Sequence, residues 1–180
     1  QKGKLSLAKQ AGRDLSKLEQ NALDYWIKVY QTPDLVQRAM PAGISPVIRQ
    51  QIFKQGVLRY AYTEPQKALA LLGQRASQYG LNHEEVGAIT KTIGLRLAYR
   101  YDPTASETLD QIDQASQDHQ TIEWQLQLTI RNGDWLRYLD LFERMPMAYQ
   151  HKKRWQYWRA RSLAKLNRNN EAQEIYQRLA

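Results

Sequence analysis

The chain has 180 residues, of which 42% are hydrophobic, and a formal net charge of +8 at pH 7. This length allows one domain or several stacked repeats that share a continuous core, and no apolar run approaches the roughly 20 residues that a membrane span needs. The absence of cysteine excludes disulfides, thiol nucleophiles and cysteine-based zinc sites.

Residues that typically begin a helix occur along the whole chain. Ser45 precedes Pro46 as a capping residue should, and capping-box patterns begin at Asn82 and Thr104. The segments between these signals predict helices near residues 5–11, 14–31, 34–40, 46–61, 64–78, 82–100, 104–116, 119–131, 134–144, 151–166 and 170–180. Because the links are short and no segment alternates like a half-buried strand, we predict an all-α fold of antiparallel helix pairs. No linker is evident, so residues 1–180 are predicted to form a single superhelical domain.

Several glycines lie inside predicted helices, where each costs about 1 kcal/mol relative to alanine. A stripe of small residues at i, i+3, i+7 and i+11 comprises Gly87, Thr90, Gly94 and Ala98. Such a stripe would let a neighbouring helix approach closely. We therefore interpret it as a packing feature, and interpret Gly56 and Gly73 in the same way.

The last third of the chain has the clearest pattern, that of a solenoid unit. One helical face comprises Trp155, Trp158, Ser162 and Leu166, and after a polar turn a second comprises Ala172, Tyr176 and Leu179. A single pair of helices cannot bury its apolar face alone and needs stacked neighbours. We therefore predict an α-solenoid that is similar to tetratricopeptide repeats at its C-terminal end. Trp135 and Trp155 have core spacing and are expected to be buried between helix layers.

Positive charge is concentrated between Arg144 and Arg168. This segment holds eight basic residues and no acidic one, while the rest of the chain holds 18 Lys or Arg and 18 Asp or Glu. It is either a solvated helix face that aids solubility or a surface that attracts a polyanion or an acidic partner domain. Tyr157, Arg161 and Lys165 fall at i, i+4 and i+8 and are the candidate ligand or partner contacts. The alternative is that these side chains only cover the edge of a core.

Three aromatic pairs place rings on two helix faces at once: Tyr25 with Trp26, Tyr99 with Tyr101, and Tyr157 with Trp158. At least one ring of each pair is therefore expected to be exposed. An exposed Tyr or Trp beside Arg could stack on sugar rings or nucleobases.

Residues with catalytic or metal-binding chemistry are few. His83, His119 and His151 form no helical zinc motif, and the chain has neither a glycine-rich phosphate loop nor a nucleophile elbow. No metal and no cofactor are expected. Paired carboxylates such as Asp110 and Asp113 lie among polar residues and are interpreted as solvated charge, so no catalytic residue is assigned.

Short segments in a fixed order carry a family resemblance. The strongest are Arg131-x-Gly133-Asp134, Glu143-Arg144-Met145-Pro146-Met147, Arg154-Trp155-x-Tyr157-Trp158 and Glu171-Ala172-x-Glu174-Ile175. Weaker but collinear segments span residues 39–43, 50–60 and 63–72. In this order and spacing the chain resembles the superhelical, ring-forming region of the soluble lytic murein transglycosylases of Gram-negative bacteria.

The resemblance implies a periplasmic parent enzyme that cleaves the β-1,4 bond between N-acetylmuramic acid and N-acetylglucosamine in peptidoglycan and leaves a 1,6-anhydro ring. In that family one glutamate of a C-terminal lysozyme-like domain acts as acid and then as base. This chain lacks that domain and its Glu-Ser motif. We therefore expect it to be a non-catalytic piece of a longer enzyme, without the signal peptide. The implied partners are peptidoglycan glycan strands and the parent's own catalytic domain.

Two other functions compete with this interpretation. The first is a tetratricopeptide-like protein–protein interaction module without an enzymatic parent, although the helices before residue 131 are irregular for a period of about 34 residues. The second is nucleic-acid binding, which has only the basic segment in its favour and none of the known motifs, so no nucleic-acid partner is expected.

Overall fold

The computed structural model describes residues 10, 12–113 and 116–180. The chain divides into two compact units, Gln1–Arg96 and Leu97–Ala180, and each is described by itself. The single domain predicted for residues 1–180 stays a prediction. The helix predicted near residues 5–11 lies almost wholly outside the described residues. Every regular element within them is helical, without strands, which confirms the all-α class.

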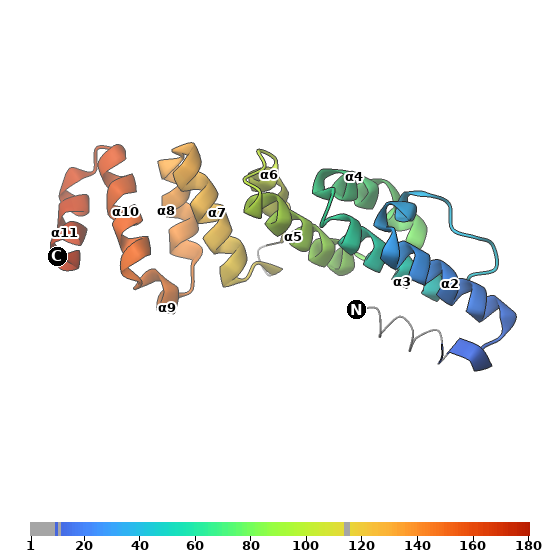
Figure 1. Ribbon diagram of the computed structural model, residues 1–180. Helices are drawn as coiled ribbons and strands as arrows, with labels where there is room; N and C mark the ends of the chain where they lie inside the picture. Colours follow the sequence, from blue (N-terminus) through green and yellow to red (C-terminus); the bar gives the residue numbers. More distant parts are fainter. Residues whose placement is uncertain (1–9, 11, 114–115) are drawn as a thin grey trace. The chain divides into compact units, whose positions relative to one another are not determined.

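The first unit is built around α3 (Figure 1). Its elements are η1 (Gly12–Asp14), α2 (Lys17–Gln31), η2 (Pro33–Gln37), α3 (Pro46–Tyr60), α4 (Pro65–Arg75), η3 (Ser77–Tyr79) and most of α5 (His83–Tyr99). Helix α3 contacts α2, η2, α4 and η3. Its buried side chains Ile52, Phe53 and Val57 form the centre of this packing, and the ring of Phe53 stacks on that of Tyr79 at 4.2 Å.

Capping explains where several helices begin. Pro46 opens α3 directly after Ser45, as predicted, but the Ser45 side chain makes no cap hydrogen bond. Asn82 and Glu85 form the expected reciprocal cap of α5, in which each backbone N–H donates to the other residue's side chain, at 3.1 and 2.8 Å. The capping box predicted at Thr104 is wrong, because its side chain makes no cap bond and its hydroxyl instead donates to the Asp102 carboxylate at 2.6 Å.

The remaining differences from the predicted helices are local. The segment after α2 is the 3-10 helix η2, which ends at Gln37, and the helix predicted over residues 104–116 stops at Asp110. A short helix, α9 (Met147–Gln150), forms where only a link was expected. The C-terminal helices begin and end within two residues of their predicted limits.

The second unit stacks helices in chain order. Its elements are α6 (Ala105–Asp110), α7 (His119–Asn132), α8 (Trp135–Arg144), α9, α10 (Lys153–Lys165) and α11 (Asn169–Leu179). In Figure 1, α8 lies between α7 and α10, and α11 packs on α10. One apolar cluster joins α7, α8 and α10 and contains Ile122, Leu126, Tyr138, Leu141, Phe142, Met145 and Trp155. A second joins α10 to α11 and contains Ala160, Leu163, Ala172 and Ile175.

Trp155 is buried as predicted, with an exposed fraction of only 1%. The Tyr138 hydroxyl donates to the Trp155 carbonyl at 2.9 Å, and burial raises the pKa of that tyrosine. The prediction for Trp135 is wrong, because this residue is only half-buried. Trp135 is the first residue of α8. The buried face of this helix lies further along it and includes Tyr138 and Phe142.

Three of the glycines assigned to packing differ in their surroundings. A Cβ on Gly56 would lie 2.6 Å from Val36 Cγ2 and 2.9 Å from Val29 Cγ1, so α3 approaches η2 and α2 closely at this point. At Gly73 and Gly87, no atom of the described residues lies within 4 Å of the corresponding position, apart from the adjoining residues and backbone of the same helix. The packing interpretation is confirmed for Gly56 and is wrong for the other two.

Replacing Trp155 with alanine is expected to lower the free energy of unfolding by about 3–5 kcal/mol, the usual loss for a buried aromatic side chain. The matched control is Tyr157→Ala, two residues away on the exposed side of α10, which should change it by less than about 1 kcal/mol. Urea denaturation of the two variants and the unchanged chain measures both effects. Equal midpoints for the two variants would contradict the assignment of Trp155 to the core.

Substitution with alanine should change the stability of the chain in opposite directions at Gly56 and at Gly73. Gly56→Ala forces a methyl group against two valines and should destabilise the chain by about 1–3 kcal/mol. Gly73→Ala adds a methyl group in open space within α4 and should stabilise it by about 0.5–1 kcal/mol. Thermal melts of both variants test this pair, and a stabilised Gly56→Ala chain would refute the close approach.

Candidate functional site

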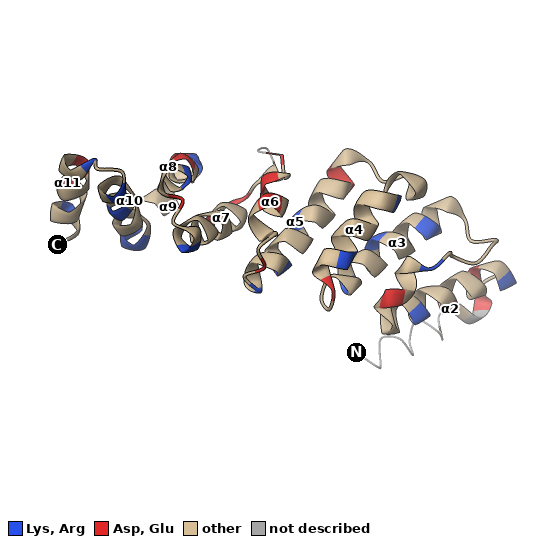
Figure 2. Ribbon diagram, turned by 90° about the horizontal axis from the view of Figure 1, so that it is seen from above, with Lys and Arg blue, Asp and Glu red and all other residues tan. Residues whose placement is uncertain are grey.

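The three residues singled out from the sequence lie together on the outer face of α10. Its inner face buries Trp155, Ala160, Ser162 and Leu163 toward α8 and α11. Tyr157, Arg161 and Lys165 are all exposed on the other side, one helical turn apart. Figure 2 shows Lys and Arg along this helix. We call these three side chains the α10 face; their contact role stays a prediction.

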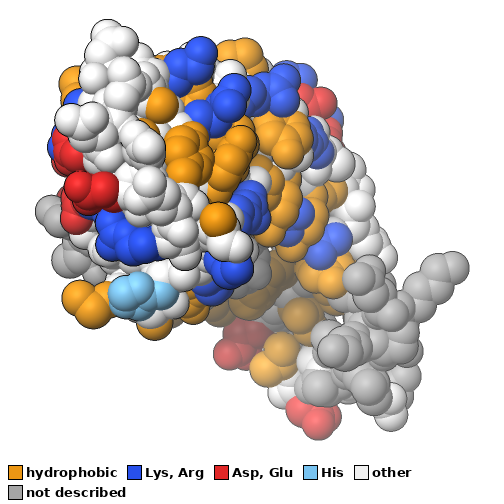
Figure 3. Space-filling model, turned by 90° about the vertical axis from the view of Figure 1, so that its left-hand side faces the viewer, with side chains coloured by type: hydrophobic (Ala, Val, Ile, Leu, Met, Phe, Trp, Pro, Cys, Tyr) orange, Lys and Arg blue, Asp and Glu red, His pale blue; other side chains and the backbone are white. Residues whose placement is uncertain are grey.

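Two aromatic rings, those of Trp158 and Tyr176, lie beside the α10 face. The Tyr157 ring, with an exposed fraction of 43%, lies edge-on to Trp158 at 5.5 Å and 6.1 Å from the ring of Tyr176 on α11. The Arg161 guanidinium lies 5.8 Å from the Trp158 ring, within the range of a cation–π contact. Figure 3, which looks at this end of the chain, shows basic side chains interspersed with hydrophobic ones. The face therefore offers flat apolar surface and positive charge together.

Part of the basic segment is neutralised by ion pairs. Arg144 pairs with Asp140 at 3.9 Å and Arg159 pairs with Glu143 at 3.3 Å. Arg168 pairs with Glu171 at 2.6 Å, and this hydrogen bond holds the pKa of the Glu171 carboxyl below its ordinary value. The basic side chains of the segment that have no ion pair within the described residues are Lys152, Lys153, Arg154, Arg161 and Lys165. The α10 face thus keeps both of its positive charges.

Another group of aromatic side chains lies at the C-terminal end of α5, in contact with α7. The Trp124 ring is edge-on to Tyr99 at 4.7 Å and to Tyr101 at 6.2 Å, and the Arg131 guanidinium lies 4.6 Å from the Tyr101 ring. The exposed fractions of Tyr99 and Tyr101 are 54% and 49%, as expected for this pair. Tyr101 has φ of +53°, a left-handed conformation that is uncommon for a bulky residue. Trp124 and Arg131 were not predicted to join the two tyrosines, because they come from another helix.

The expectation that one ring of Tyr25 and Trp26 is exposed is wrong. Both are half-buried in the first unit. The Tyr25 hydroxyl donates to the Leu35 carbonyl at 3.5 Å. Trp26 lines an apolar cavity of about 220 Å³ together with Leu15 and Leu23, among others. This pair therefore serves packing in α2.

The carboxylates that could have suggested acid catalysis have ordinary ionic partners. Glu85 caps α5 and accepts a hydrogen bond from Lys54 at 2.6 Å, which holds the pKa of its carboxyl below the ordinary value. Asp110 forms an ion pair with Arg137 and accepts a hydrogen bond from Gln125 at 2.9 Å. The described residues contain no group of three or more His, Asp or Glu that could hold a metal ion. None of their helices is long and apolar enough to cross a membrane.

These features define an all-helical protein of stacked helices whose exposed aromatic and basic side chains suit contact with a ligand or partner. No family model matches the chain, and no curated protein does. Solved structures do match it.

The lytic transglycosylase Slt of Pseudomonas aeruginosa, solved as an inactive mutant, is 31% identical over 97% of this chain, with a TM-score of 0.81. The 70 kDa soluble lytic transglycosylase SLT70 of Escherichia coli is 20% identical over 98% of it, with a TM-score of 0.68. This chain spans 28% and 29% of those two chains. The predicted resemblance to soluble lytic transglycosylases is confirmed: the chain has the helical fold of both and shares sequence with the first. Its similarity to tetratricopeptide repeats stays a prediction.

Proposed function

We propose that the chain is a non-catalytic helical scaffold region of a periplasmic soluble lytic murein transglycosylase. The observation that carries this proposal is the similarity to Slt, which extends over 97% of this chain at 31% identity. The whole enzyme would cleave the β-1,4 bond between N-acetylmuramic acid and N-acetylglucosamine in peptidoglycan and release 1,6-anhydromuropeptides. This region would carry the catalytic domain and hold the glycan strand.

The chemistry of the carboxylates supports the scaffold role. Glycosidic cleavage needs a carboxylic acid that stays protonated near neutral pH, which requires a raised pKa. The pKa values of the Glu19, Glu85 and Glu171 carboxyls are all lowered, because each accepts hydrogen bonds as a carboxylate. These three groups are therefore suited to capping and ion pairing.

The α10 face is the proposed contact surface for glycan strands or for the parent's own catalytic domain. Peptidoglycan combines sugar rings with acidic stem peptides, and Tyr157 with Arg161 and Lys165 offers a stacking ring beside two positive charges. The cluster of Tyr99, Tyr101 and Trp124 adds a second exposed aromatic surface in the same unit.

A tetratricopeptide-like interaction module remains the second candidate. The packed pair α10 and α11, with its own apolar cluster, is the observation that favours it. The similarity to Slt extends through both units, however, whereas the repeat-like pattern is confined to this one pair. The transglycosylase scaffold therefore accounts for more of the chain.

The chain by itself is expected to release no anhydromuropeptides from peptidoglycan, because none of its acids is assigned a catalytic role. Purified sacculi would be incubated with the chain, and the soluble products analysed by mass spectrometry. The positive control is an intact lytic transglycosylase. A clear yield from a preparation free of other enzymes would refute the non-catalytic assignment.

Reversing the charge of the α10 face should weaken sedimentation with sacculi. The double variant Arg161→Glu with Lys165→Glu is expected to reduce the association roughly tenfold at low salt, because it replaces attraction by repulsion. Its thermal melt should be nearly unchanged, since exposed charges contribute little to stability. The control is Lys17→Glu with Lys28→Glu, which changes net charge equally at two exposed positions of α2.

The two double variants separate a specific surface from general electrostatics. A specific α10 face predicts that only the first variant loses binding to sacculi. Equal losses in both variants, or equal losses for sacculi and for DNA that vanish at moderate salt, would show non-specific attraction. That result would remove the contact role of Tyr157, Arg161 and Lys165.

A further inference from the structure

A cavity of about 510 Å³ opens in the first unit, between the beginning of α3 and the 3-10 helix η3. Ile44, Pro46 and Arg49 line it on one side, and residues 77–80 line it on the other. Its volume is within the range of about 300–1,000 Å³ found for small-molecule sites. It also far exceeds the roughly 30 Å³ that one water occupies in the liquid. We call this space the α3 cavity.

The two sides of the α3 cavity are fastened to each other by α3 itself. The Gln50 side-chain amide donates to the Gly80 carbonyl at 2.7 Å, and the ring of Phe53 stacks on that of the buried Tyr79. Positions three or four apart lie on the same face of a helix. Arg49, four positions before Phe53, therefore lies at the edge of the face of α3 that contacts η3. The walls are thus formed before any ligand arrives.

Arg49 brings a positive charge to this cavity that no acidic side chain neutralises. It is half-buried, and within the described residues its guanidinium has neither an ion pair nor a hydrogen bond. None of the described residues that line the cavity is acidic. Arg59, on the same helix, is also half-buried, but it donates to the Tyr30 carbonyl at 2.9 Å and lies over the Tyr30 ring. The donors of Arg49 are therefore available to an anion.

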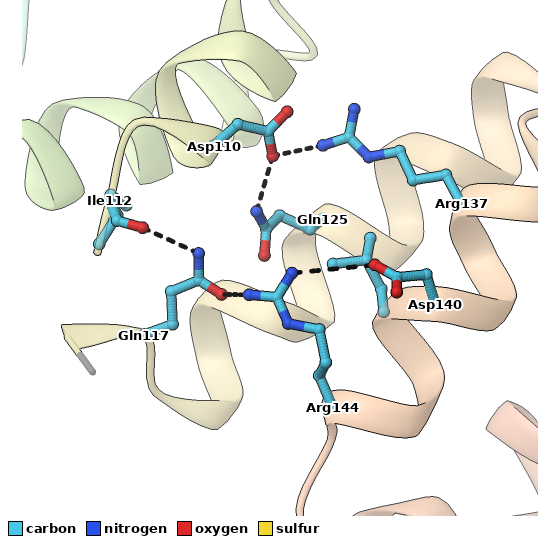
Figure 4. A pocket seen from close by; sticks show the side chains of 8 residues that line it. Asp110, Ile112, Gln117, Gln125, Arg137, Asp140 and Arg144 are labelled. Carbon is cyan, nitrogen blue, oxygen red and sulfur yellow. Dashed lines mark hydrogen bonds and ion pairs between the residues drawn. The ribbon is translucent and has the colours of Figure 1, made fainter. Parts of the chain in front are cut away.

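The polar cavity between α6, α7 and α8 in the second unit shows the opposite arrangement (Figure 4). There Asp110 pairs with Arg137, and Asp140 pairs with Arg144. An anion would have to displace a carboxylate from one of these pairs, so it gains little. No such competitor lines the α3 cavity among the described residues, and a ligand with a negative charge is favoured.

The other lining residues define the rest of the ligand. Ile44, Pro46 and Tyr79 supply apolar surface, and the exposed Ser77 supplies a hydroxyl that can donate a hydrogen bond. A guanidinium binds a carboxylate through two parallel hydrogen bonds, and one cation balances one negative charge. The matching ligand therefore has a single carboxylate next to an apolar body.

We propose that the α3 cavity binds a monocarboxylate with an apolar body about as large as a phenyl ring. The carboxylate lies on the Arg49 guanidinium, and the body packs against Ile44 and Pro46. Either a free acid or the C-terminus of a polypeptide with an apolar last side chain supplies this chemistry. The proposal does not rest on the proposed function above, which sedimentation with sacculi judges separately.

Binding is tested on the whole 180-residue chain by NMR titration with 3-phenylpropanoate. One control ligand is 3-phenylpropanamide, which has the same body without the charge, and the other is acetate, which has the charge without the body. The reporters are the Arg49 Nε–H and the backbone amide of Gly80. Saturable shifts of both are expected with the phenyl acid, with a dissociation constant on the order of 1 mM. Both controls should bind at least about tenfold more weakly.

Variants locate the site, with the Gly80 amide as reporter. Arg49→Gln removes the guanidinium and should weaken binding by about tenfold or more. Its thermal melt should be nearly unchanged, because the guanidinium has no partner within the described residues. Lys28→Gln, which removes one charge from an exposed position of α2, is the control and should bind normally. If Arg49→Gln does not fold, Arg49→Lys keeps the charge but loses the planar fork, and should weaken binding several-fold.

Three outcomes would overturn the proposal: no saturable shift, equal binding of either control ligand, or unchanged binding by the Arg49 variant. A tripeptide that ends in phenylalanine with a free carboxylate then separates the two sources. Binding about tenfold tighter than that of 3-phenylpropanoate supports the C-terminus of a polypeptide as the natural ligand. Equal or weaker binding supports a free acid.

Discussion

The second unit depends on how Trp155 is held against α8. The indole fills the space between α7, α8 and α10, and the buried Tyr138 hydroxyl donates to the Trp155 carbonyl at 2.9 Å. Dispersion contacts alone would allow α10 to rotate about its axis, because apolar attraction has little directional preference. The hydrogen bond from a rigid side chain selects one rotation. The placement of every other side chain of α10 follows from that choice.

The exposed chemistry of α10 is a consequence of this fixed rotation. With Trp155 turned inward, Tyr157 and the residues four and eight positions later face outward. Arg161 lies over the half-buried Trp158, whose ring also packs on the core cluster. The α10 face is thus attached directly to the core. Under the proposed function, a ligand that stacks on these rings would meet side chains that are already ordered, which would lower the entropy lost on binding.

Local patterns in the sequence predicted the helices well, but they could not predict which residues meet across helices. Trp155 was identified because core spacing within one helix is visible in the chain, whereas Trp135 has the same spacing and is half-buried at the start of α8. Gly56 and Gly73 look alike in sequence, yet only the first faces the valines of two other elements. The polar cavity of the second unit has no local signal, because Asp110 meets Gln125 and Arg137, which follow it by 15 and 27 positions.

The α10 face and the polar cavity between α6, α7 and α8 differ in their charge. The α10 face carries uncompensated positive charge in water, so its attraction is long-ranged and is screened within about 10 Å at 0.1 M salt. The cavity is electrically balanced, because Asp110 pairs with Arg137 and Asp140 pairs with Arg144. Its polar groups therefore act on one another over short distances and are less affected by salt than exposed charges are. Under the proposed function, only the α10 face would attract the acidic groups of a glycan strand from a distance, so its contribution would fall as salt is added.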